Sequence, residues 1–187
     1  MYEGIDTVVL HNELACHGTM PLEWEPLDTA PDQFRLSGME EGNLLLLQAC
    51  VAVEEHPVRE KNEEMTPLAS ELARLDFKLN LVVQLLGTLV ATRSAAAPIP
   101  LRFNATGASW QLRGAPPIRG AKGIFKVQLR SSQPQTLNLF SEITAVDEKQ
   151  VSARFLQLPE AVSELIQRLC FLQHRKQVAG ARKSRNS

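Results

Sequence analysis

The chain has 187 residues, a formal net charge of -1, 44% hydrophobic residues and 5% aromatic residues. The hydrophobic content is sufficient for the core of one domain with an appendage, or of two small domains. The near-zero charge gives no general attraction to nucleic acid or acidic lipid, and the scarcity of aromatic residues argues against a base-stacking surface.

The N-terminal region, residues 1–60, has the weakest pattern and is expected to hold short strands and one helix. Strands are predicted at Ile5–Leu10 and Phe34–Leu36, and three prolines break the intervening stretch into turns and extended pieces. Asn43 is a suitable N-cap for a helix over the leucine-rich run that follows it and ends before Pro57. A buried strand is the alternative for that run.

The clearest pattern in the chain is a heptad repeat, assigned to a long helix over residues 64–95. Thr66 can cap this helix, and Pro67 suits its first turn. A helix with an apolar seam of this period is suited to meet another helix along its length. The seam consists of Leu68, Leu72, Leu75, Leu79, Val82, Leu86 and Leu89.

Further apolar residues of the same helix lie outside the seam, so much of its second half must be covered. They are Phe77, Leu81, Val83, Leu85 and Val90. Packing on its own domain and on other subunits together would cover them, which favours a homo-oligomer, and a tetramer over a dimer. The alternative is a single core helix packed inside one domain.

After Pro100 the hydrophobic period changes from helical to alternating. Apolar residues at every second position predict short strands within Leu101–Ala105, Phe125–Leu129, Leu137–Ala145 and Val151–Phe155. A helix then follows Pro159, with Gly180 as its expected end, and residues 181–187 are expected to be a disordered tail. The predicted fold class is α+β: a small antiparallel barrel with a C-terminal helix over residues 98–180, preceded by the long heptad helix.

Five segments of the C-terminal half follow one another in an order that a known family shares. They are N-A-T-G-A-S-W, G-I-F-K-V-Q-L, L-N-L-F-S-E-I-T-A-V, V-S-A-R-F-L-Q-L-P and a helix ending L-I-Q-R-L-C-F-L-Q-H-R-K-Q. This half resembles the PilZ domain, a six-stranded barrel with a C-terminal helix that is a common bacterial receptor for cyclic di-GMP. The long helix is similar to the heptad-bearing insert of the divergent, tetrameric PilZ subgroup of xanthomonad-type bacteria.

The resemblance implies two ligand motifs, and this chain departs from both. The first, R-x-x-x-R, is missing, because no two arginines are four residues apart; Arg93 alone stands near its expected place, and Arg74 with Lys78 is the nearest substitute. The second, [D/N]-x-S-x-x-G, maps to Asn104, Thr106 and Ser109. Lysine cannot reproduce the bidentate grip of arginine on phosphate, so we expect binding of cyclic di-GMP by the family mode to be lost.

The resemblance therefore implies a non-enzymatic cytoplasmic protein without a cofactor that acts by protein contacts. It implies a role in motility, type IV pilus function or virulence signalling, with itself and other signalling or pilus proteins as partners. The alternative is a cyclic di-GMP receptor whose degenerate site is completed by Arg93, Arg102 or arginines of a neighbouring subunit.

Other chemistry has weaker support in the sequence. His11, Cys16 and His17 form the one compact group of potential metal ligands, but no fourth ligand is nearby, so no metal is expected. Cys50 and Cys170 lie far from Cys16 in sequence, which predicts reduced thiols rather than a disulfide framework.

Two further groups of residues have both a structural and a functional interpretation. A possible positive patch is read as a solvated face, so nucleic-acid binding is not expected; it comprises Arg113, Arg119, Lys122, Lys126 and Arg130. No membrane span is expected either, because the longest strongly apolar stretch, near Leu79 to Val90, is interrupted by polar residues. Trp24 and Trp110 are interpreted as core or interface anchors, although Trp110 follows the degenerate motif and could stack on a ligand base.

Overall fold

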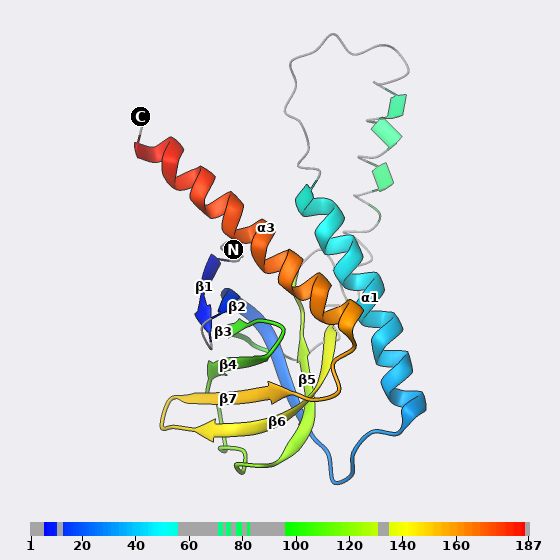
Figure 1. Ribbon diagram of the computed structural model, residues 1–187, viewed down its shortest axis with the longest axis vertical. Coiled ribbons are helices and arrows are strands. Elements are labelled where there is room, and N and C mark those ends of the chain that lie inside the picture. The colour runs from blue at the N-terminus through cyan, green and yellow to red at the C-terminus, as the bar shows by residue number, and fades with distance from the viewer. Residues whose placement is uncertain are drawn as a thin grey trace.

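A computed structural model describes residues 6–10, 13–55, 71–72, 74–75, 78–79, 82, 96–130 and 135–185 (Figure 1). Its named elements are, in chain order, β1 (Asp6–Leu10), β2 (Glu13–Pro26), α1 (Gln33–Glu55), β3 (Pro98–Phe103), β4 (Gly107–Gln111), β5 (Lys122–Val127), β6 (Leu137–Val146), β7 (Gln150–Phe155) and α3 (Glu160–Arg185). Within this described part, no helix has the length and apolar character needed to span a bilayer.

The strands form an antiparallel barrel that closes through β2. The sheet order is β1-β2-β3-β4-β7-β6-β5, and a further pairing of β2 with β5 joins its two sides. The first half of β2, Cys16–Pro21, pairs with β3, and the second half, Leu22–Pro26, pairs with β5. Six strands therefore close the barrel, and β1 extends it as a hairpin on β2.

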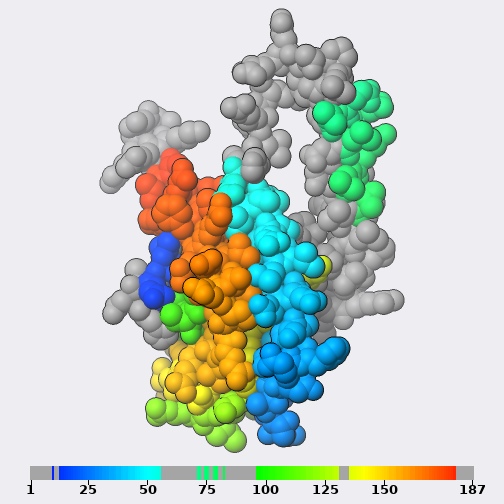
Figure 2. Space-filling view, turned by 45° about the vertical axis from the view of Figure 1, so that its right-hand side comes forward, coloured from blue at the N-terminus to red at the C-terminus, as the bar shows by residue number. Residues whose placement is uncertain are grey.

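Helices α1 and α3 lie side by side and cover the barrel together (Figures 1 and 2). Residues of both helices join the barrel interior in one hydrophobic core: Leu46, Leu47, Cys50 and Val51 from α1, and Val162, Ile166, Leu169 and Cys170 from α3. The apolar stripe of α3 follows the helical spacing that its sequence predicts. The barrel and the two helices are thus one packed unit.

Helix α1 begins at Gln33, eleven residues before its expected first residue, Leu44. Asp32 caps it, because its carboxylate accepts a hydrogen bond from the backbone N–H of Arg35 at 2.8 Å. The strand expected at Phe34–Leu36 is therefore wrong, and so is Asn43 as the N-cap. The helix over the leucine-rich run is confirmed and is described as far as Glu55; Pro57 lies outside the described residues.

Asn43 is buried inside α1, where its side chain pairs with the backbone of β6. Its Nδ2 donates to the carbonyl of Asn138 at 2.7 Å, and its Oδ1 accepts from the N–H of Asn138 at 2.9 Å. Asn138 pairs with Lys126 of β5 on one side, but β7 pairs with the other side of β6 only from Ser141 onward, so that side has no strand partner at Asn138. The Asn43 amide replaces that partner and attaches α1 to the barrel.

The strands expected near residues 5, 101, 125, 137 and 151 are confirmed as β1, β3, β5, β6 and β7. The prolines of 13–26 do not break the chain into turns, because they lie within β2. Ala145 leaves the buried face of β6 at an irregularity between Ile143 and Ala145. Helix α3 continues to Arg185, so its expected end at Gly180 is wrong and residues 181–185 are helical.

Ion pairs connect the elements around the core. Glu54, which is buried near the end of α1, pairs with Arg130 after β5 and with Lys176 of α3. Glu55 accepts a hydrogen bond from Nε of Arg168 on α3 at 2.8 Å. These contacts hold the end of α1 against α3.

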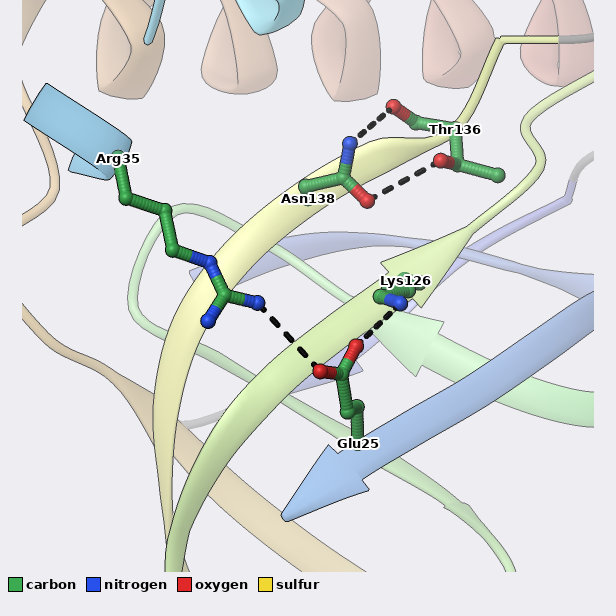
Figure 3. A network of polar contacts seen from close by, with 5 residues as sticks. All are labelled: Glu25, Arg35, Lys126, Thr136 and Asn138. Carbon is green, nitrogen blue, oxygen red and sulfur yellow. Dashed lines mark hydrogen bonds and ion pairs between the residues drawn. The ribbon is translucent and has the colours of Figure 1, made fainter. Parts of the chain in front are cut away.

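A second polar group lies where β2, β5 and the first turn of α1 meet. Glu25 lies between Lys126 and Arg35 and pairs with both, while Thr136 and Asn138 bond to each other on β6 and the segment before it (Figure 3). The hydrogen bond from Lys126 lowers the pKa of Glu25.

Candidate functional site

Asn104, the first residue of the degenerate motif, lies in the tight turn between β3 and β4 and is only 2% exposed. Its Oδ1 accepts hydrogen bonds from the backbone N–H groups of Thr106 and Gly107 at 2.9 and 3.1 Å, and from the Thr106 hydroxyl at 2.6 Å. Its Nδ2 donates to the carbonyl of Leu10 at 3.0 Å. Both ends of the amide therefore serve the turn and the neighbouring β1.

The last motif position, Ser109, and Gly107 between the motif positions are also occupied by contacts within the sheet. Gly107 begins β4 where it passes close to β7, and a Cβ there would collide with the carbonyl oxygen of Ala153. Ser109 is buried, its hydroxyl lies 3.2 Å from that of Ser152, and Gln150 donates to it. A ligand could use Asn104 or Ser109 only by displacing these bonds.

Of the arginines expected to compensate, one lies beside the motif. Arg102 on β3 is directly opposite Ser109 on β4, and His17 on β2 is opposite Arg102. Because directly paired residues share a face of a sheet, the three side chains lie on one face of the barrel wall. Arg93 lies outside the described residues.

The seam of the predicted long helix is described at four positions, and all four are helical. Their exposed fractions are 59% for Leu72, 59% for Leu75, 64% for Leu79 and 51% for Val82. Leu68, Leu86 and Leu89 lie outside the described residues. The four described positions present an apolar stripe at helical spacing that this chain leaves open to solvent.

Comparison with protein families decides the assignment. Residues 47–183 match the atypical PilZ domain, which is described as a cyclic di-GMP receptor. The chain belongs to the atypical PilZ domain family. The match spans the seam, the barrel from β3 onward and α3, and therefore contains both the degenerate motif and the exposed stripe.

A solved structure shows the same PilZ fold. It is a pathogenic protein from Xanthomonas campestris, described as a new tetrameric PilZ domain that self-assembles via an unusual helical bundle. The similarity covers 91% of this chain and 93% of that chain, with a TM-score of 0.68 and 22% sequence identity. A comparison with curated proteins returned no match.

Two of the three potential metal ligands, Cys16 and His17, are described in the barrel, and they lie on opposite faces of its wall because they are neighbours on β2. Cys16 points into the core, where its sulfur lies 2.8 Å from that of Cys170; this hydrogen bond, together with burial, raises the pKa of Cys16. His11 lies outside the described residues, and the rest of the described chain holds no group of three potential ligands.

Two of the five cations expected in a positive patch are paired with carboxylates. Lys126 pairs with Glu25, and Arg130 pairs with the buried Glu54. Trp110 packs against Phe125 with ring centroids 5.6 Å apart and is 6% exposed, which confirms its interpretation as a core anchor. Trp24 is half-buried and donates from Nε1 to the Ser141 hydroxyl at 3.1 Å.

The sequence reasoning missed the structural role of Asn104. A signal for it was present, because an asparagine with threonine two residues later and glycine three residues later is typical of a turn in which the amide bonds to the backbone ahead of it. The position of Arg102 beside Ser109 had no local signal, since it depends on the register of two strands.

Proposed function

We propose that this protein is a non-enzymatic PilZ assembly protein that forms a homo-oligomer, a tetramer, through its heptad helix. The observation that carries the proposal is the exposed stripe of Leu72, Leu75, Leu79 and Val82. Burying an apolar side chain of this size contributes about 1.5–3 kcal/mol, so a stripe of four gives a strong drive to associate. A second copy of the chain carries the same stripe and can cover it over its whole length.

The Xanthomonas campestris protein supports this choice of partner, since it is described as self-assembling via a helical bundle. Leucine at the a positions gives no preference for a two-stranded coil, and the apolar residues outside the seam favour four helices over two. We further propose that the assembly acts by protein contacts in motility, type IV pilus function or virulence signalling.

Light scattering coupled to size exclusion tests the assembly directly. At micromolar concentration the expected molar mass is four times that of the chain, falling on dilution toward lower states. A monomer mass that does not change with concentration would refute the proposal.

We also propose that cyclic di-GMP binding by the family mode is lost. Asn104 and Ser109 use their polar atoms within the fold, and the arginine pair that would neutralise two phosphates is missing from the sequence. Charge-assisted hydrogen bonds contribute about 1.5–3 kcal/mol each, so losing several weakens binding by orders of magnitude.

The competing proposal is a cyclic di-GMP receptor, which the family description and the position of Arg102 opposite Ser109 favour. Isothermal titration calorimetry of the full chain separates the two. We expect no saturable heat. Low-micromolar binding at one site per chain that Arg102→Gln abolishes would establish the receptor instead.

A further inference from the structure

A cavity lies at the far end of β3 and β4 from the Asn104 turn. It has a volume of about 530 Å³ and is lined by residues that begin β3 and β7 and end β4, by the second half of β2, and by the loop that follows β4. Its apolar lining includes Leu22, Trp24, Ile99, Trp110, Leu112 and Ile118. This volume is within the range of about 300–1,000 Å³ that is usual for small-molecule sites.

Packing within the barrel fixes the two tryptophan walls of this cavity. The Trp24 indole is held by its hydrogen bond to Ser141, and its ring lies so close to Gly123 that a Cβ at that glycine would be 2.6 Å from it. Trp110 packs against Phe125 in the core. These walls are formed before any ligand arrives, which lowers the cost of ordering them on binding.

The outer wall is the segment Pro116–Pro117–Ile118 of the loop between β4 and β5. The Ile118 side chain is 79% exposed, although it lines the cavity, so it stands at the opening. Two backbone hydrogen bonds hold the loop to β6: the N–H of Gly120 donates to the Ile143 carbonyl at 2.8 Å, and the N–H of Ile143 donates to the Ala121 carbonyl at 2.9 Å. Within the loop, the N–H of Ala121 donates to the Ile118 carbonyl at 3.0 Å. The prolines restrict the backbone of this wall further.

Arg113 is the one charged residue among those that line the cavity. It is exposed, it makes no ion pair with any residue that the structure describes, and no carboxylate lines the cavity. An apolar hollow with one unneutralised guanidinium at its edge matches a ligand that is apolar at one end and anionic at the other.

We propose that this cavity binds a small amphiphilic carboxylate, with its hydrocarbon part between Trp24, Trp110 and Ile118 and its carboxylate on Arg113. The site is separate from the degenerate cyclic di-GMP motif. It also suits that nucleotide poorly, since two phosphates and two polar bases would meet apolar walls and a single cation. The proposal does not depend on the oligomeric state or on loss of nucleotide binding.

The two tryptophans of the chain both line the cavity, so they report on it directly. The test uses the full-length protein and three probes with the same hydrocarbon chain, each below its micelle concentration: decanoate, decanol and decyltrimethylammonium. Tryptophan emission and calorimetry follow each titration. Decanoate should bind saturably, at least about tenfold more tightly than decanol, and the cation most weakly.

Three variants separate the cavity from general surface effects. Arg113→Gln should remove the preference for decanoate over decanol and leave decanol binding unchanged. Ala121→Leu, which fills the cavity, should weaken both. Arg119→Gln is the matched control, because it removes an arginine of the same loop that does not line this cavity.

Equal affinity for the three probes, or an equal effect of Arg113→Gln and Arg119→Gln, would overturn the assignment of the carboxylate to Arg113. Absence of saturable binding by all three probes would overturn the site itself. The circular dichroism spectrum and the melting temperature of each variant show that it is folded, so a lost response can be attributed to the cavity.

Discussion

The β3–β4 turn buries polar side chains, whereas the heptad segment exposes apolar ones. In the turn, polar residues that a family motif would offer to a ligand are buried, and hydrogen bonds within the protein occupy them. In the heptad segment, the four described seam residues are apolar side chains that would normally enter a core, and they are exposed. A buried, satisfied polar group indicates a structural role, whereas an exposed apolar stripe indicates a missing partner.

The largest effect is expected in the heptad segment. Replacing Leu75 and Leu79 with glutamate places two charges inside the proposed helix bundle, so the assembly should dissociate to monomers while the barrel stays folded. Light scattering measures the mass, and far-ultraviolet circular dichroism measures the fold.

Arg74→Glu is the matched control, since Arg74 is on the same helix but outside the seam and makes a surface ion pair with Glu71. Its oligomeric mass should be unchanged. If the double variant keeps the oligomeric mass, the exposed stripe is not the interface and the contrast between the two regions fails.

The β3–β4 turn should respond in stability rather than in assembly. Asn104→Ala leaves the buried N–H of Gly107 and the carbonyl of Leu10 without their partners, which should lower the free energy of unfolding by about 2–4 kcal/mol. Denaturant unfolding measures the loss. Thr106→Ala, which removes one hydroxyl bond at an exposed position, should cost about 1 kcal/mol or less. If Asn104→Ala loses no more stability than Thr106→Ala, the Asn104 amide is not required by the turn and is available to a ligand.

Asn43 extends the same test to the contact between α1 and β6. Asn43→Leu keeps the volume but leaves the N–H and carbonyl of Asn138 unpaired, and should cost about 1–3 kcal/mol. The exposed Gln48→Leu on the same helix is the control, with an expected change within about 0.5 kcal/mol. Equal unfolding midpoints for the two variants would contradict the structural role of Asn43.

The smallest effect concerns Glu25, a partly exposed carboxylate. Its pKa is lowered by Lys126, so the pair stabilises the fold above the ordinary pKa of glutamate and loses this contribution as the pH falls through the lowered value. Lys126→Met should therefore lower the free energy of unfolding by less than about 1 kcal/mol at pH 7. The difference in stability between this variant and the unsubstituted protein should become smaller below about pH 4. The melting temperatures of the two proteins, measured across this pH range, check the prediction. A stability difference that grows as the pH falls would contradict it.

Local patterns predicted the elements whose side chains alternate regularly. The strands near Phe125 and Val151 and the helix after Pro159 could be recognised because one face of each enters a core. The strand β2 could not be recognised, because its two halves pair with different neighbours and its prolines resemble loop residues. The start of α1 was misplaced because its first ten residues contribute little to the core.

Some features of the candidate site could likewise be predicted from the sequence, and others could not. The loss of the arginine pair and the position of the heptad seam can be read from the sequence, because each depends on residue spacing alone. The direction in which Asn104 points, the place of Arg102 beside Ser109 and the meeting of both tryptophans at one cavity depend on strand pairing between distant segments.

The sequence by itself determined that this chain carries an apolar helix seam and a PilZ barrel with a degenerate motif. Only the tertiary structure decided that the motif residues bond within the fold and that the described part of the seam faces solvent. The physical reason is that residue type sets whether a side chain can be buried. The register of the strands and the packing of the helices then decide which side chains are buried.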